Sequence, residues 1–381
     1  MSNSRKTVQS LAVLCDSSLS PHQTNKQLDI TSSETSFFIE LATENRVLAL
    51  LGKNLQDREL PDEWISVIND LNKLCLNTAA LNLLFLHHAD NILQEARLQN
   101  IDMIPLKGIG FIDRIYKPDE RQLIDIDIMV KYDQIQQCNS LMNKLQFTTP
   151  ESCLPDRFSM DYSGEIKYSA IKTGTNIDVE LQWDPVPYLS KRVFCIEPEI
   201  FWKNRNDNSM LSPEAEILYQ IVHLSLRHPY TRLIWFIDIK RLIESSDIDW
   251  ELLSDYIINS GLSIASRHIF NFLRRYLWLE LPHSFIKKLK IGGRETVLDN
   301  LIIETIAGNK RLKRTGICTF LSAENKIKLL SAMLFPDRVF MEKRYPNAPL
   351  PISYAIRLFD LGVKSTGIQL PYNISDRTAS R

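Results

Sequence analysis

Two aspartates, spaced two residues apart among strand-forming residues, most constrain what this chain can fold into. Asp125 and Asp127 lie in the segment Arg121-Gln-Leu-Ile-Asp-Ile-Asp-Ile-Met-Val130, whose isoleucines, methionine and valine favour an extended strand. Side chains at positions i and i+2 of a strand point to the same face, so the two carboxylates should lie together. Such a pair could bind hard divalent cations. The alternative is a strand with exposed alternating charges, and the spacing alone does not decide between them.

Two further features favour a cation site. Lys107-Gly108 lies at a predicted junction of a strand and a helix, where a glycine lets backbone amides approach an anion and the helix N-terminus adds positive potential. A second predicted strand, 176–183, carries Asp178 and Glu180 in the same i, i+2 relation. A third carboxylate on a neighbouring strand is what a two-metal site requires, because each hard cation binds several oxygen ligands.

The periodicity of apolar residues indicates helices at both ends of the chain and strands between them. The predicted helices are 37–55, 61–99, 108–116, 133–145, 213–227, 231–245, 249–258, 263–278, 283–290, 295–307 and 325–334, and the predicted strands are 101–106, 123–130, 166–171 and 176–183. The last two strands are joined by Lys172-Thr-Gly-Thr175, a hairpin signature. Residues 16–36 and 149–164 are predicted to be irregular.

The 381 residues are enough for two or three packed units. We expect an α+β fold in which a small mixed sheet is flanked by N-terminal and C-terminal helical blocks. The expected division is a helical region over residues 1–100, an α/β core over 101–190 and a helical domain over 191–381.

Charge and cysteine content exclude some classes of protein. A formal net charge of −1 argues against bulk electrostatic binding to nucleic acids or anionic membranes. Residues 267–314 contain eleven Lys/Arg against four Asp/Glu, which indicates solvated helix faces or a surface for an acidic partner. The six cysteines have no metal-binding or redox spacing and are predicted to be buried and reduced. No secretory signal or membrane-length apolar run is visible, so a cytoplasmic protein is expected.

The order of these motifs resembles the polymerase-β-type nucleotidyltransferase superfamily. More closely, it resembles an uncharacterised nucleotidyltransferase family found in bacterial peptide-modifying and polysaccharide gene neighbourhoods. That family has an LKG motif before R…DxD, matched here by Leu106-Lys107-Gly108 and by Arg121 with Asp125-Ile-Asp127. An acidic residue followed by Leu-His-Trp usually comes next, whereas this chain has Glu180-Leu-Gln-Trp183, with Gln182 in the histidine position. The match covers most of the chain.

The resemblance implies an NTP-dependent transferase. A nucleophile of the acceptor would attack the α-phosphate of the NTP, and pyrophosphate would leave. Two Mg²⁺ ions would be held by three carboxylates, those of Asp125, Asp127 and Glu180. Glu180 could also help to remove a proton from the nucleophile.

The same resemblance implies that Lys107 and the Gly108 amide contact the β- and γ-phosphates, and that Arg121 either does the same or pairs with Asp125. The acceptor would be a small molecule, a peptide or a protein; a membrane is not expected as partner, and a nucleic acid is a less favoured one. Two alternatives stay open. One is phosphoryl transfer to a peptide by the same metal site, and the other is a non-catalytic scaffold that retains the fold.

Other candidate residues have simpler interpretations. Asp238 interrupts an apolar helix, where it could pair with Arg232 or Arg241 or could lie beside the nucleotide. His87 and His88 have no second ligand at i+4 and are predicted to pack or face solvent. His223 and His228 are five residues apart, a spacing that does not place them on one face of an α-helix.

Overall fold

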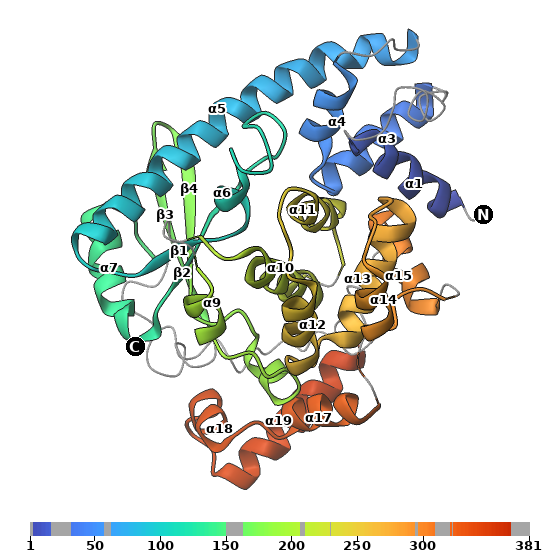
Figure 1. The fold of residues 1–381 in the computed structure, drawn as a ribbon. Coiled ribbons are helices and arrows are strands. Elements are labelled where there is room, and N and C mark those ends of the chain that lie inside the picture. The colour runs from blue at the N-terminus through green and yellow to red at the C-terminus, as the bar shows by residue number, and fades with distance from the viewer. Residues whose placement is uncertain are drawn as a thin grey trace.

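A four-stranded mixed sheet forms the centre of one half of the molecule (Figure 1). This computed structural model describes residues 3–16, 32–56, 62–149, 163–205, 210–228, 230–293, 296–308, 321 and 323–366. The strands are β1 (Met103–Pro105), β2 (Ile126–Val130), β3 (Glu165–Lys172) and β4 (Thr175–Gln182). Their order is β1-β2-β4-β3, with β2 parallel to β4 and the other neighbours antiparallel. The predicted α+β class with a mixed sheet is confirmed.

The β3–β4 hairpin follows from its turn sequence. Thr173 and Gly174 have φ values of 48° and 79°, and positive φ at both central residues is the geometry that two-residue hairpins favour. The predicted strand 123–130 is shorter than expected, because β2 begins at Ile126. The segment that precedes β2 is bonded to a helix and not to the sheet. The Leu123 N–H donates a hydrogen bond of 2.9 Å to the side-chain oxygen of Asn82.

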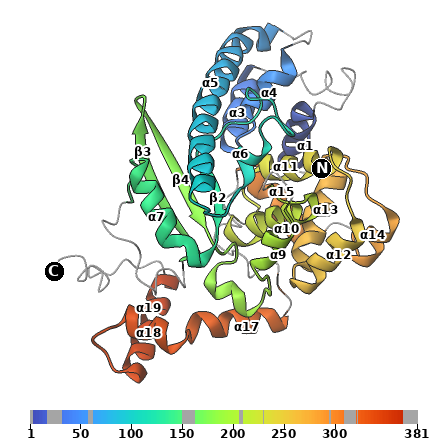
Figure 2. The ribbon, with the colours of Figure 1, turned by 60° about the vertical axis from the view of Figure 1, so that its left-hand side comes forward.

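The two faces of the sheet differ in polarity. Because side chains alternate along a strand, Ile126, Ile128, Val179 and Leu181 share one face and are buried. Helix α7 (Ile135–Lys144) covers that face, where Tyr168 of β3 donates a hydrogen bond to Asn139 at 3.0 Å. The opposite face carries the polar side chains and is turned toward helix α10 (Pro213–Val222). Figure 2 shows α7 and α10 on opposite sides of the sheet.

The N-terminal helices are α1 (Asn3–Cys15), α3 (Ser32–Glu44), α4 (Leu48–Leu55) and α5 (Asp62–Leu98). The helix predicted over 61–99 is confirmed as α5. The single helix predicted over 37–55 is wrong, since the segment forms α3 and α4 with a break at Asn45–Val47. Arg46 in the break has a φ of 57°, a left-handed conformation that ends an α-helix. Helix α1 was not predicted.

Shorter helical elements lie between the strands and after the last one. Between the strands are α6 (Lys107–Phe111) and the 3₁₀ turn η1 (Tyr132–Gln134), and after β4 come the 3₁₀ turn η2 (Tyr188–Arg192) and α9 (Glu199–Lys203). The helix predicted over 108–116 ends early because Asp113 has a φ of 64° and the chain turns back to form a bridge between Ile112 and Tyr116.

The C-terminal half is helical, as predicted. Its elements are α10, the π-helical turn η3 (His223–Arg227), α11 (Leu233–Glu244), α12 (Trp250–Asn259), α13 (Ser263–Tyr276), α14 (His283–Lys288), α15 (Val297–Ile306), α17 (Ala323–Leu334), α18 (Arg338–Arg344) and α19 (Leu350–Thr366). The last three form the lower edge of the molecule in Figure 1. Helices α9, α18 and α19 were not predicted.

The two helical blocks pack on each other beside the sheet. Helix α1 contacts α13 and α15 of the C-terminal half (Figure 1). The division into 1–100, 101–190 and 191–381 stays a prediction. Cys15, Cys75 and Cys138 are buried as expected, whereas Cys195 is exposed. Among the helices that the structure describes, none is long and apolar enough to cross a bilayer.

The basic segment 267–314 is only partly described, since 309–320 and 294–295 lie outside the described residues. Within it, Lys288 pairs with Glu251 at 2.7 Å and with Asp255 at 2.8 Å. Most of the two predicted irregular stretches also lies outside the described residues.

Candidate active site

A polar cavity of about 180 Å³ lies between the polar face of the sheet and the helices of both blocks. Every site residue predicted from the sequence lines it: Lys107, Gly108, Arg121, Asp125, Asp127 and Glu180. The remaining lining residues are Arg46, Gln122, Leu123, Ile124, His223, His228, Arg232, Ile234 and Trp235. Side chains from segments far apart in the sequence therefore share one concave site, as ligand sites do.

The parallel pairing of β2 with β4 brings the three carboxylates to one cavity. Asp127 is directly opposite Glu180 in the register, and Asp125 precedes β2 by one residue. Asp125 and Glu180 have no hydrogen-bond or ion-pair partner among the described residues. Burial, reinforced by the Asp127 charge, raises the pKa of Glu180 to about 7, and the same two causes raise the pKa of Asp125. Burial and the neighbouring Asp127 charge thus disfavour the charged form of both acids.

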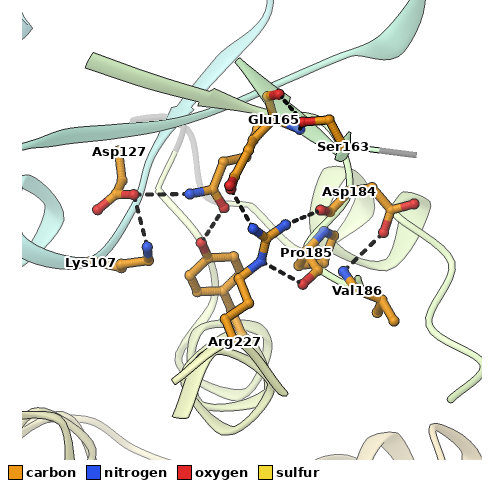
Figure 3. A network of polar contacts seen from close by, with 10 residues as sticks. Lys107, Asp127, Ser163, Glu165, Asp184, Pro185, Val186 and Arg227 are labelled. Atoms are coloured by element: carbon orange, nitrogen blue, oxygen red, sulfur yellow. Dashed lines mark hydrogen bonds and ion pairs between the residues drawn. The ribbon is translucent and has the colours of Figure 1, made fainter. Parts of the chain in front are cut away.

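Asp127 is fixed by a chain of hydrogen bonds (Figure 3). Its Oδ1 accepts bonds from Lys107 Nζ at 2.8 Å and from Gln182 Nε2 at 2.9 Å, and the Gln182 Oε1 accepts one from Tyr219 at 2.7 Å. Burial alone would lower the pKa of Lys107, but the adjacent Asp127 raises it above its ordinary value. Gln182 therefore orients Asp127.

The Lys107–Asp127 pair bears directly on cation binding. One oxygen of Asp127 already receives two donors, and the lysine is positioned next to it with a φ of 48°. Within the described part of the chain, no three His, Cys, Asp or Glu side chains are arranged as a ready ligand cluster. A cation entering the cavity would therefore compete with Lys107 for Asp127.

Arg121 is held by a buried acid from a distant helix. Its Nε and Nη2 donate to the two oxygens of Asp238 at 2.9 Å each, and Tyr116 also donates to Asp238 at 2.8 Å. The alternative in which Arg121 pairs with Asp125 is therefore wrong, as is the pairing of Asp238 with Arg232 or Arg241. The two partners are 117 positions apart, and only the packing of α11 against the loop before β2 brings them together.

Gly108 is needed for this arrangement. A Cβ atom at position 108 would lie 2.7 Å from the Arg121 Nη1 and 2.5 Å from the Leu123 Cδ2. Any side chain there would push the arginine away from Asp238. The loop that carries Arg121 is fixed in turn by Asn82 of α5, whose amide donates to the carbonyls of Pro118 and Arg121 at 2.7 Å each.

His223 and His228 contact each other, contrary to the expectation from their spacing. The segment between them is a π-helical turn, in which the His228 N–H donates to the His223 carbonyl at 3.0 Å. Residues five apart are aligned in a π-turn, and the two ring centroids are 4.7 Å apart. Both rings pack on Trp235, with centroid distances of 5.0 Å. The buried His223 Nδ1 has no hydrogen-bond partner among the described residues.

The neighbouring Arg227 explains how the π-turn is held against the sheet. Its guanidinium donates to the carbonyl of Pro185 at 3.1 Å and to that of Asp184 at 2.9 Å, and it forms an ion pair with Glu165 (Figure 3).

Burial lowers the pKa of His228 to about 4 and lowers that of His223 well below its ordinary range, and nearby cations add to both shifts. Both rings are therefore neutral at physiological pH.

Sequence reasoning missed Arg46 and Arg232. Both line the cavity, one from the break between α3 and α4 and the other from the residue before α11. Asn45 was the one sequence signal for the break between α3 and α4, because asparagine is a common residue at a helix end. The apolar periodicity continues across that position and concealed the break.

Comparison with known proteins agrees with the geometry. A family model described as "Uncharacterised nucleotidyltransferase" matches residues 31–277, more than half of the chain. The matched range includes the whole sheet and every residue that lines the cavity. No curated protein and no solved structure matches this chain.

Proposed function

The chain belongs to the uncharacterised nucleotidyltransferase family, and we propose that it transfers a nucleoside monophosphate from an NTP to a small-molecule, peptide or protein acceptor in a Mg²⁺-dependent reaction. The observation that carries the proposal is the sharing of one cavity by Asp125, Asp127 and Glu180, two of which have no partner among the described residues. Asp125 and Glu180 are half-buried, and acids that have no partner and a shifted pKa are typical of catalytic sites.

The donor set fits a hard cation. Asp125 and Glu180 offer free carboxylate oxygens, and Asp127 offers the oxygen that Lys107 and Gln182 do not use. All are hard oxygen ligands, which Mg²⁺ prefers. These three residues would hold the two ions, which when bound neutralise the phosphates and lower the pKa of the attacking hydroxyl.

The residues of the chain have separate roles in this reaction. A bond forms between the acceptor oxygen and the α-phosphorus while the bond from that phosphorus to the bridging oxygen of the β-phosphate breaks, and pyrophosphate leaves. Glu180, with a pKa of about 7, is suited to accept the proton of the acceptor hydroxyl. Lys107, Gly108 and Arg121 line the cavity, and Lys107, the Gly108 amide and Arg121 would contact the β- and γ-phosphates.

Labelled nucleotides test the proposal. The protein is incubated with Mg²⁺ and with NTP carrying the label on the α- or the γ-phosphate, in the presence of small-molecule, peptide and protein fractions. Transfer of the α-label with release of pyrophosphate is expected. Transfer of the γ-label alone would identify phosphoryl transfer instead. Calorimetry that finds no metal-dependent NTP binding would favour a scaffold.

We predict that Lys107→Met increases the affinity for Mn²⁺, used as a spectroscopic substitute for Mg²⁺. The lysine competes with a cation for Asp127, and a charge-assisted hydrogen bond of about 1.5–3 kcal/mol corresponds to a gain of about tenfold or more. Electron paramagnetic resonance of free Mn²⁺ measures the change. The matched control is Lys131→Met, which removes a lysine paired with Asp102 outside the cavity. Weaker Mn²⁺ binding by Lys107→Met would show that Lys107 positions Asp127 for the ion and does not compete with it.

A further inference from the structure

The four cations that line the cavity fall into two classes. Lys107 and Arg121 are each paired with a buried acid, Asp127 and Asp238 respectively. The other two are Arg46 and Arg232, which are half-buried. Across the described ranges, no acid lies within ion-pair distance of either of these arginines. The positive charge that is free to bind an anion therefore comes from Arg46 and Arg232.

One buried side chain brings these two arginines together. Asn45 donates to the carbonyls of Leu41 and Ile306 at 2.9 Å each, and its Oδ1 accepts the N–H of Leu233 at 2.9 Å. The Asn45 side chain thus accepts a backbone N–H from the first turn of α11, as an N-cap residue does, although it belongs to a different helical block. Arg46 follows Asn45 in the chain and Arg232 precedes Leu233, so this junction brings both arginines to the lining of one cavity.

The Arg232 guanidinium lies over the Trp235 ring, with its central carbon 5.2 Å from the ring centroid. Among the described residues the guanidinium has no hydrogen-bond partner. A guanidinium can bind phosphate oxygens through two N–H groups at once. Arg46 is held by its left-handed backbone in the break between α3 and α4.

Arg46 and Arg232 line the cavity close enough for their positive charges to interact. Burial, and next the charge of Arg232, lowers the pKa of Arg46 to about 10. A polyanion bound between the two arginines would relieve this repulsion. The triphosphate chain of an NTP is such a polyanion.

We propose that Arg46 and Arg232 form the clamp that binds the triphosphate chain of the NTP, with Asn45 as the positioning residue that joins its two halves. The proposal rests on the proposed function. It adds to the predicted contacts of Lys107 and Arg121 two cations that form no ion pair with an acid of the described residues.

Inorganic tripolyphosphate in the presence of a chelator is the direct probe, because it removes the metal, the nucleoside and the acceptor from the measurement. Calorimetry on the full chain should show binding by the wild type. Arg46→Gln and Arg232→Gln should each weaken it by about tenfold or more, since each removes charge-assisted hydrogen bonds. Arg46→Lys should recover part of the loss. Arg97→Gln, at an exposed arginine of α5 outside the cavity, should bind as the wild type does.

The outcomes separate this proposal from the proposed function. Unchanged affinity in both glutamine variants, or no binding by the wild type, would overturn the clamp even if nucleotidyl transfer is observed. Tripolyphosphate binding that depends on both arginines, in a protein that transfers no nucleotide, would support the clamp and reject the transferase. Thermal unfolding of each variant verifies the fold, and the two arginines lie on different helical blocks, so both variants would not fail for one structural reason.

Discussion

Asp127→Asn is expected to lower the rate of nucleotidyl transfer by about 10³-fold, because the site would lose several kcal/mol of charge stabilisation around the reacting phosphate. Asp127 is 4 % exposed and lies opposite Glu180 in the sheet register. The asparagine oxygen can still accept the bonds from Lys107 and Gln182, so the side chain keeps its place while the negative charge is lost. Single-turnover transfer of α-labelled nucleotide at saturating NTP measures the effect.

Asp178→Asn provides the matched control for this experiment. Asp178 lies on β4 two residues before Glu180, on the same face of the strand, but it bonds to Ser169 at 2.6 Å and pairs with Lys167 at 2.7 Å outside the cavity. Transfer by this variant should stay within about twofold of the wild type, as for a surface carboxylate. A rate for Asp127→Asn within about tenfold of the wild type would contradict its role as a metal ligand.

Asp238→Ala is expected to destabilise the protein by about 3–5 kcal/mol, the usual cost of leaving a buried charge without its partner. The Asp238 side chain is fully buried and neutralises Arg121 through two hydrogen bonds of 2.9 Å. Its loss would leave the guanidinium unpaired beside Gly108 and would also remove the partner of Tyr116. The midpoint of urea-induced unfolding, together with its slope, measures the change.

Two comparisons isolate the ion pair from the loss of packing. Tyr116→Phe removes only the hydrogen bond of 2.8 Å to Asp238 and should cost about 1 kcal/mol. The double variant Arg121→Met, Asp238→Leu should recover part of the stability lost in Asp238→Ala, because no unpaired charge stays buried. A cost below about 1 kcal/mol for Asp238→Ala would mean that Arg121 reaches solvent or a different acid.

Whether a predicted segment forms a helix or a strand could be inferred from the sequence, because this choice depends on local rules. Alternation of side chains predicted Asp125 and Asp127 on one side of a strand, and both line the same cavity although Asp125 precedes β2 by one residue. Two positive φ values could be expected in the turn at Thr173 and Gly174. The 37-residue helix α5 follows from its long apolar periodicity. Such patterns involve neighbours within a few residues, so they survive most tertiary contexts.

Local rules failed where distant contacts determine the backbone. The break at Asn45 interrupts a regular apolar pattern because its amide bonds to Leu233 and Ile306, which lie 188 and 261 residues away. The contact between His223 and His228 depends on a π-turn that the spacing of residues does not reveal. The free energy gained by burying these contacts exceeds the intrinsic preference of each segment for a regular α-helix.

The sequence by itself predicted three acids and a lysine–glycine pair as site residues, and all of them line one cavity, since motif spacing and strand periodicity are properties of the local chain. Only the tertiary structure decided the ionic partners within it. Arg121 pairs with Asp238 rather than with Asp125, and Lys107 pairs with Asp127, because a buried charge binds whichever opposite charge the packing of helices and strands brings within reach. The same packing left Arg46 and Arg232 without an acid among the described residues, facing the cavity.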